Sequence, residues 1–304
     1  SSFTILKAHD GTAFIPMTYS IVACDVERGE VGAAVATGWP AVGSVVPWVE
    51  AGAGAVTTQA FTNISLGPHG LALLRDGAAA EVVLERLLAS DPERELRQLG
   101  VVDMSGRAAA HTGDGCVAEA GHITADGVGV QANMVERSSV WPAMLEAFEH
   151  EGGELADRLL AALTAGEREG GDVRGIRSAA LIVSPSAAGE RPWARLFDLR
   201  VDASSSPLED LGRALAVARA YQALSAGIAA AGAGDLEAAL EQSARAWGLA
   251  PDDAHVALWH ALVLMASGRE DEARSLLDEA LRAEPRSKEF ARRFADSEPG
   301  APLA

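Results

Sequence analysis

The chain has 304 residues, of which 48% are hydrophobic, and it carries a formal net charge of -18 at pH 7. This length predicts one large and one small domain, with enough apolar residues for a buried core. The negative charge repels phosphate backbones and anionic membrane surfaces, so we expect neither a nucleic acid nor a membrane as partner. The apolar runs of the sequence are shorter than the roughly 20 residues that cross a bilayer.

The N-terminal region and the cysteines bear on cellular location. Residues 1–17 lack the pattern of a secretory signal, and we interpret them as a leader or a misassigned start, because Met17 is a candidate start of translation. The two cysteines, Cys24 and Cys116, are too few for a disulfide framework and fit a reducing compartment. We therefore expect a cytoplasmic protein.

From Thr18 to residue 203 the pattern predicts an α+β domain. We expect strands at residues 18–24, 31–36, 53–59, 98–103, 107–112, 127–131, 178–183 and 196–201. We expect helices at residues 66–89, interrupted at Gly77, and at 138–151 and 154–165. Antiparallel hairpins with helices grouped between them favour a layered α+β domain over a doubly wound parallel sheet.

The composition changes near residues 204–207, and the sequence beyond is rich in alanine and in helical patterns. Several positions recur there with an offset of 34 residues, which is the period of tetratricopeptide repeats. The matching pairs are Gly234 with Gly268, Ala239 with Ala273, Ala246 with Ala280, and Pro251 with Pro285. We therefore predict a helical repeat domain at 207–295, which is a candidate surface for peptide binding or for a homo-oligomer.

The Met17-Thr18 pair offers a catalytic chemistry. Removal of Met17, or self-cleavage before Thr18, would give Thr18 a free α-amine beside its own hydroxyl. A threonine hydroxyl needs an adjacent base, and an α-amine with a pKa of roughly 7.7–8.0 is suited to that role. A proteasome-like arrangement would place a lysine nearby, but residues 18–204 contain none, so another group must position the amine. The alternative is that Thr18 is an ordinary β-branched residue at the start of a strand.

A series of short segments bears on that choice. They are residues 18–23 (TYSIVA), 41–48 (AVGSVVPW), 58–63 (TQAFTN), 67–70 (GPHG), 97–103 (RQLGVVD), 110–113 (AHTG), 120–122 (AGH), 130–134 (VQANM) and 178–181 (SAAL). In these segments the sequence from about residue 18 to 202 resembles a bacterial family similar to N-terminal-nucleophile (Ntn) hydrolases, known as domain of unknown function 1028. Members of that family often carry a tetratricopeptide-like tail.

The resemblance implies a four-layer αββα sandwich, in which two antiparallel sheets lie between helical layers. It also implies a nucleophile at the N-terminus of the first strand, which falls on Thr18. It does not supply a substrate. If residues 1–17 stay attached, the amine is an amide and the proposed base is lost.

Acyl transfer also requires hydrogen-bond donors for the developing oxyanion. Asn63 and Asn133 are candidates for this role, and a turn or cap function is the alternative for each. Four further side chains and one backbone segment are candidates for binding substrate. These are Gln59 in the cleft, the segment at Ser44, His111 at a strand end, Asp172 in a polar loop, and Arg177, whose planar guanidinium suits a carboxylate.

A metal site is a competing interpretation of the histidines. His111, Asp114, Cys116 and His122 are all ligand types, but their spacing matches no standard zinc pattern. We expect neither a metal nor another cofactor.

These observations predict an Ntn-type hydrolase that acts on the amide bond of a small molecule or peptide. The alternative is a non-catalytic scaffold or peptide-binding protein that uses the repeat tail, because a fold does not by itself determine a function.

Overall fold

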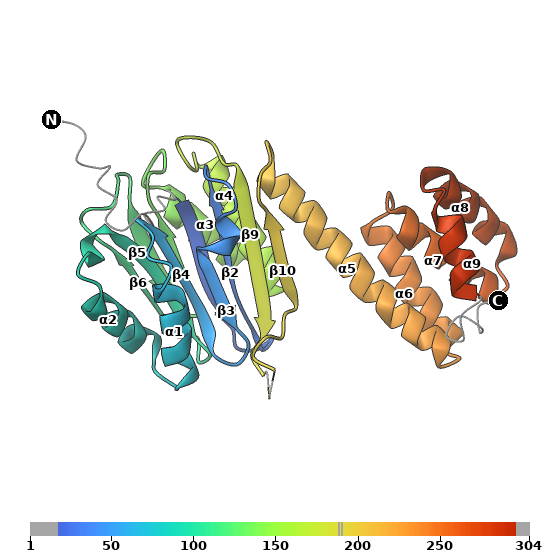
Figure 1. Ribbon diagram of the computed structural model, residues 1–304, viewed down its shortest axis with the longest axis horizontal. Helices are drawn as coiled ribbons and strands as arrows, with labels where there is room; N and C mark the ends of the chain where they lie inside the picture. The colour runs from blue at the N-terminus through green and yellow to red at the C-terminus, as the bar shows by residue number, and fades with distance from the viewer. Residues whose placement is uncertain (1–17, 188, 190, 296–304) are drawn as a thin grey trace. The chain divides into compact units, whose positions relative to one another are not determined.

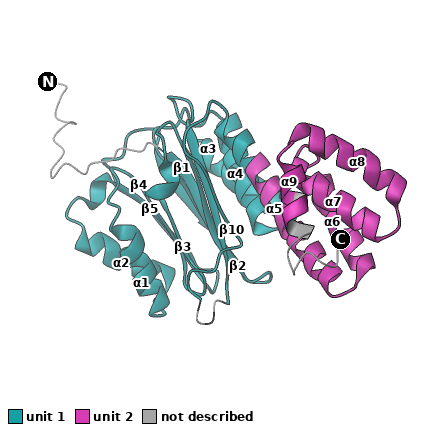
Figure 2. Ribbon diagram, turned by 45° about the vertical axis from the view of Figure 1, so that its right-hand side comes forward, with its two compact units in different colours: residues 1–212 teal, residues 213–304 magenta. Residues whose placement is uncertain are grey.

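A computed structural model describes residues 18–187, 189 and 191–295, so the predicted leader at 1–17 lies outside the described residues. Contacts within the chain divide it into two compact units, Ser1–Gly212 and Arg213–Ala304, which are coloured separately in Figure 2. Each unit is described by itself.

The first unit contains a six-stranded antiparallel sheet in the order β10-β9-β2-β1-β8-β7. Its strands are β1 (Thr18–Asp25), β2 (Glu30–Thr37), β7 (Gly121–Ala125), β8 (Val128–Ala132), β9 (Ser178–Pro185) and β10 (Phe197–Val201). Strand β1 pairs with β2 on one side and with β8 on the other. The first strand of the domain is therefore an interior strand of the sheet.

A second antiparallel sheet has the order β3-β4-β5-β6. Its strands are β3 (Pro47–Glu50), β4 (Gly54–Ala60), β5 (Arg97–Asp103) and β6 (Ala108–Thr112). The two sheets face each other, and Val22 and Ala33 of the first sheet share a buried cluster with Ala55 and Val102 of the second. This apolar contact holds the sandwich together.

Helices cover the outer face of each sheet (Figure 1). Helices α1 (Leu66–Arg75) and α2 (Ala80–Ser90) pack on the four-stranded sheet, where Leu71 and Leu87 join one apolar core. Helices α3 (Val140–His150) and α4 (Leu155–Arg168) pack on the six-stranded sheet. The layers follow the order α-β-β-α, so the predicted four-layer α+β sandwich is confirmed.

Two strands were not predicted from the sequence. The strands predicted from the sequence leave gaps at residues 37–52 and 113–126, yet β3 and β7 lie within these gaps. Both strands lie at the edge of a sheet, and β7 contains no fully buried residue. Pro47 begins β3, a position that a sheet tolerates only at strand starts or edges. Because edge strands are half-covered, they lack the apolar runs that identify interior strands.

The second unit is helical. It contains α6 (Leu236–Leu249), α7 (Ala254–Ala266), α8 (Glu270–Ala283) and α9 (Ser287–Ala295), and helix α5 (Pro207–Gly232) enters it across the boundary at Gly212. Helices α6 and α8 begin 34 residues apart, at Leu236 and Glu270. The matched alanines of the two repeats are buried: Ala239, Ala246, Ala273 and Ala280. The helical repeat region expected from the period is confirmed.

Helix α5 bears on the expectation about apolar runs, although its own apolar stretches are interrupted by polar and charged residues. By length and composition alone it is long and apolar enough to cross a membrane. Its Ala220, Ala223 and Leu224 lie in an apolar cluster with Val256 and Trp259 of α7, and this packing accounts for the apolar character of that part of the helix.

Position 67 in α1 requires a glycine because the helix backbone passes close to the side chain of Trp48. A Cβ atom added at Gly67 would lie 2.3 Å from Cδ1 of Trp48, so the Gly67→Ala substitution forces the indole or the helix to move. We expect a loss of about 1–3 kcal/mol in the free energy of unfolding, as for other overpacked cores. Denaturant unfolding measures it. The control is Gly212→Ala, where the nearest atom lies at 3.6 Å and stability should be unchanged or slightly higher. Equal stabilities for the two variants would contradict the prediction.

Candidate active site

Thr18 is the first residue of β1 and its position is fixed by Asn133, which follows β8. The Thr18 amide donates to the Asn133 carbonyl oxygen at 3.3 Å, and the Asn133 amide donates to the Thr18 carbonyl oxygen at 3.0 Å. Side chains alternate along a strand, so Thr18 and Ser20 share the face that looks toward the second sheet. Tyr19 points the other way and donates to Glu167 of α4 at 2.7 Å.

The hydroxyl of Thr18 is buried and makes no hydrogen bond with the described residues. Thr18 has no exposed surface, and its Oγ1 makes no hydrogen bond within the described part of the chain. A buried polar group without a partner costs about 1–3 kcal/mol, so such groups are rare and call for an explanation. Asn133 Oδ1 and Gln131 Oε1 share this condition. Three unpartnered oxygens therefore come from residues in or beside β1 and β8.

A cluster of buried side-chain amides surrounds the backbone of Thr18. Gln59 Nε2 on β4 donates to the Thr18 carbonyl oxygen at 3.2 Å, and Asn133 Nδ2 donates to the same oxygen at 3.3 Å. Both nitrogens also donate to Gln98 Oε1 on β5, at 2.6 and 2.8 Å. The cluster therefore joins both sheets at the residue that we expect to react.

The cluster continues deeper between the sheets. Ser20 Oγ donates to Gln59 Oε1 at 2.6 Å, and Gln131 Nε2 donates to Ser20 Oγ at 2.7 Å and to Thr57 Oγ1 at 2.8 Å. Gln98 Nε2 donates to Thr112 Oγ1 at 2.8 Å. A polar network of this kind holds its members in one geometry when its bonds are made.

Backbone strain lies next to the same residues. Within residues 18–187, 189 and 191–295, the non-glycine residues with positive φ are Ala41, Ala60 and Met134, at 57°, 67° and 52°. Ala60 follows Gln59 and Met134 follows Asn133, the two residues whose side chains bind the Thr18 carbonyl. Such conformations are uncommon outside glycine and concentrate at functional sites.

An arginine missed by the sequence reasoning lies at the same end of the sheet. Asp172 is buried and accepts from the Gly38 amide at 2.7 Å and from Arg174 Nε and Nη2 at 2.9 and 2.7 Å. Arg174 Nη2 lies 3.4 Å from Thr37 Oγ1, and Thr37 is the residue opposite Thr18 in the β1–β2 ladder. Asp172 therefore holds Arg174 one strand away from Thr18.

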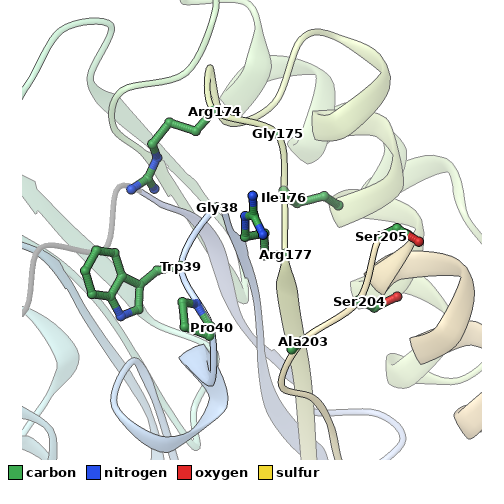
Figure 3. Close-up of a pocket in the computed structure, with 10 residues that line it drawn as sticks. All are labelled: Gly38, Trp39, Pro40, Arg174, Gly175, Ile176, Arg177, Ala203, Ser204 and Ser205. Carbon is green, nitrogen blue, oxygen red and sulfur yellow. The ribbon is translucent and has the colours of Figure 1, made fainter.

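An open pocket of about 670 Å³ lies beside this arginine. Figure 3 shows its lining, with Trp39 and Pro40 from the turn after β2, and Arg174 and Arg177 from the segment before β9. Ala203, Ser204 and Ser205 complete one wall. Arg177, predicted to bind substrate, is thus placed in a pocket at the Thr18 end of the sheet.

Three other predicted residues make hydrogen bonds outside the amide cluster. Asn63 donates to Asp91 at 3.2 Å and accepts from Ser65 Oγ at 2.7 Å. Ser44 Oγ donates to the Ala41 carbonyl oxygen, and His111 Nε2 lies 3.1 Å from the Arg94 carbonyl oxygen. None of the side-chain bonds found for these residues reaches Thr18 in the described structure. Thr18, Gln59 and Asn133 are the predicted residues that come together directly.

Gln98 and Gln131 were missed, although the sequence contained a signal for them. Gln131 is a polar residue between Val130 and Ala132, and Gln98 directly precedes the apolar run from Leu99 to Val102. Polar residues in buried strands are expected to bond one another. The partners could not be assigned from the sequence because these two glutamines and Gln59 come from three separate hairpins.

The two cysteines and the candidate metal ligands offer less suitable chemistry than Thr18. Burial raises the pKa of Cys24 and that of Cys116 to about 11, so both thiols are protonated at neutral pH and are weak nucleophiles. Among the described residues, no group of three or more His, Cys, Asp or Glu side chains converges as a metal site would require.

Comparison with known proteins agrees with this two-part organisation. The model of a family of unknown function, DUF1028, matches residues 18–211, and a tetratricopeptide repeat model matches residues 230–292. The crystal structure of protein SPO2555 from Silicibacter pomeroyi, a DUF1028 protein, is similar with a TM-score of 0.59 and 34% sequence identity, over 65% of this chain and 87% of that one. A search of curated proteins found no match.

The amide cluster should depend on Gln98. Replacing Gln98 with leucine keeps the volume similar but leaves the amide groups of Gln59 and Asn133 without their common acceptor. We expect the free energy of unfolding to fall by about 3 kcal/mol or more, because each buried group left unpaired costs about 1–3 kcal/mol. Denaturant unfolding measures the change. A loss below about 1 kcal/mol would show that the cluster adds little to stability.

The Asp91–Arg97 pair should give the domain an acid-sensitive stability. Burial opposes ionisation of Asp91, but hydrogen bonds from Arg97, the Glu93 amide and Asn63 outweigh it and hold the pKa of Asp91 below its usual value. The stabilisation is present above the unfolded pKa of about 3.9 and is lost as the pH falls further. Asp91→Asn should remove this part of the pH dependence and cost on the order of 3 kcal/mol at pH 7.

Unfolding at pH 7 and at several acidic pH values tests this expectation. Asp114→Asn, at an exposed position, is the matched control and should leave both the stability and its pH dependence unchanged. An Asp91→Asn protein with the wild-type pH profile would contradict it.

Proposed function

The chain belongs to the DUF1028 family, whose function is unknown, and from the geometry around Thr18 we propose that it is an amide hydrolase of the N-terminal-nucleophile type. The observation that carries this proposal is the hydroxyl of Thr18, which is buried and without a partner among the described residues while its backbone is bonded on both sides. A hydroxyl held in place but left unbonded suits a nucleophile, because it need not break a bond before it reacts.

The reaction has two halves. Thr18 Oγ1 attacks the carbonyl carbon of the amide, and its proton passes to the α-amine of Thr18 and then to the leaving nitrogen as the C–N bond breaks. The acyl group is then an ester on Oγ1. Water attacks this ester and gives a proton to the same amine, which returns it to Oγ1, so that a carboxylic acid leaves and the hydroxyl is restored.

This chemistry requires a free α-amine, and hence cleavage of the bond between Met17 and Thr18. The Thr18 nitrogen lies 3.3 Å from the Asn133 carbonyl oxygen, which would accept one N–H of the amine and orient its lone pair. This contact supplies the positioning that a lysine provides in proteasome-like sites, and residues 18–204 contain no lysine.

We assign Asn133 as donor to the oxyanion. Its Nδ2 lies 3.3 Å from the carbonyl oxygen of Thr18 and 2.8 Å from Gln98 Oε1, so the oxyanion would take the place of one of these two acceptors. Gln59 Nε2 lies 3.2 Å from the same carbonyl oxygen. Removing one oxyanion donor typically lowers kcat by about 10²–10³-fold. Asn63 is left out of this assignment because its side-chain bonds, to Asp91 and Ser65, lie outside the cluster that surrounds Thr18.

A chain that begins at Thr18 should hydrolyse small amides, and Thr18→Ala in the same processed form should not. Thr18→Ser should keep part of the activity because it keeps the hydroxyl and the amine. The rate should rise with pH as the amine loses its proton, with a midpoint near its pKa of roughly 7.7–8.0. Release of free amine from a panel of simple amides measures turnover, and mass spectrometry verifies the N-terminus.

The matched control is Thr124→Ala on β7, at an exposed position, which should leave turnover unchanged. Activity that persists in Thr18→Ala would overturn the proposal. Turnover by a chain that retains residues before Thr18 would overturn the role of the amine.

A further inference from the structure

We propose that the pocket lined by Trp39, Arg174 and Arg177 binds a carboxylate, so that the substrate is an anionic amide. This inference rests on the proposed hydrolase function, and it names the substrate class of the same site. Arg177 is the residue that we assign to the carboxylate.

The pocket lies at the reactive end of the six-stranded sheet. Thr18 begins β1, Thr37 opposite it ends β2, and Ser178 opposite Thr37 begins β9. Seven of the ten lining residues come from the segments directly after Thr37 and directly before Ser178. Most of its lining is therefore continuous in sequence with the ends of β2 and β9.

The strand spacing gives a length for the substrate. Neighbouring strands lie about 4.8 Å apart, so the strand that carries Arg177 is roughly 10 Å from the backbone of Thr18. An extended amide with a carboxylate a few bonds from the carbonyl spans a distance of this order once the threonine and arginine side chains reach toward it. N-acylated amino acids and short peptides with a free carboxylate have this length.

The charges of the pocket favour an anion. Its ten lining residues include two arginines and no aspartate or glutamate, although the whole chain carries a net charge of -18. Asp172 pairs with Arg174 from a position with no exposed side-chain surface, so it does not face a ligand. A strongly acidic chain repels a dianion more than a monoanion, which favours a carboxylate over a phosphate.

Arg177 is the cation that the fold leaves for a ligand. Its backbone amide donates to the Thr37 carbonyl oxygen at 2.7 Å, which fixes its place at the start of β9. Its exposed side chain makes no hydrogen bond or ion pair with the described residues, whereas Arg174 is bound twice by Asp172. A planar guanidinium binds a carboxylate through two parallel hydrogen bonds.

Trp39 provides the apolar part of the site. Its side chain is 41% exposed, and in Figure 3 it lies on the same side of the Gly38 turn as Arg174. An indole offers a flat apolar surface to an acyl chain or an amino-acid side chain. With a volume of about 670 Å³, the pocket is in the size range of small-molecule sites.

The test compares a carboxylate with its neutral counterpart, separately from turnover. The full chain carrying Thr18→Ala is titrated with N-acetylphenylalanine and with N-acetylphenylalaninamide by calorimetry. We expect the acid to bind at least about tenfold more tightly than the amide. Added salt should weaken the binding of the acid and leave that of the amide unchanged. Arg177→Gln should abolish the difference. Arg177→Lys keeps the positive charge but loses the planar guanidinium, so it should retain part of the difference in affinity.

Arg86→Gln, at an exposed position on α2, is the matched control and should leave both affinities unchanged. Circular dichroism establishes that each variant is folded. Equal affinities for the acid and the amide, no detectable binding of the acid, or an unchanged preference in folded Arg177→Gln would overturn the inference. A preference for phenylphosphate over the acid would overturn the assignment to carboxylates.

The outcomes separate the two proposals. If processed wild-type protein hydrolyses neutral amides as fast as acids and Arg177→Gln changes neither rate, the hydrolase function stands and the carboxylate site fails. If the acid binds through Arg177 but wild-type protein releases no amine from any amide, the hydrolase function fails and Arg177 belongs to a binding site.

Discussion

The hydrogen bonds that join β1 to β2 and β8 fix the geometry of everything around Thr18. An interior strand is bonded on both sides, so its first residue has little freedom to shift along or across the sheet. Asn133 closes the ladder at that residue with two further backbone bonds. The position of Thr18 is thus set by the whole sheet, and a local loop contributes little to it.

The second sheet contacts the Thr18 end of the first sheet through polar side chains, where apolar packing would be the usual contact. Most of the contact between the sheets is apolar, but at the Thr18 end Gln59 and Gln98 face Gln131 and Asn133. Burying four amides is unfavourable unless they are hydrogen-bonded. Gln59 and Asn133 both donate to Gln98, and Gln131 donates to Ser20 and Thr57, while Gln131 Oε1 and Asn133 Oδ1 have no partner among the described residues. The same bonds exclude alternative side-chain positions, so the cluster favours one orientation of the Thr18 backbone. The positive φ of Ala60 and Met134 shows that the neighbouring backbone is held against its local preference.

The sequence predicted the parts of the molecule that depend on local pattern. The hairpin at β1 and β2, the break between α1 and α2 at Gly77, and the 34-residue period of the repeat all follow from neighbouring residues, and Gly77 indeed has a φ of 84°. The α+β class followed from the order of hairpins and helices, and the four-layer sandwich came from the resemblance. Contacts between distant segments were harder: Gln98 and Arg174 belong to the site only because β5 and the loop before β9 approach Thr18 in space. The edge strands β3 and β7 were not predicted because partly exposed strands contain fewer apolar residues in a row.

Helix α5 has a consequence for how this chain can be divided. The boundary between the two compact units falls at Gly212, inside a helix that is continuous from Pro207 to Gly232. A fragment that ended there would keep only residues 207–212 of the helix, a length at which helices in water are unstable. Fragments for expression or crystallisation should therefore end beyond α5 or before it. For the same reason, limited proteolysis should not release the two units by cutting at their boundary, because a folded helix resists the extended conformation that proteases bind.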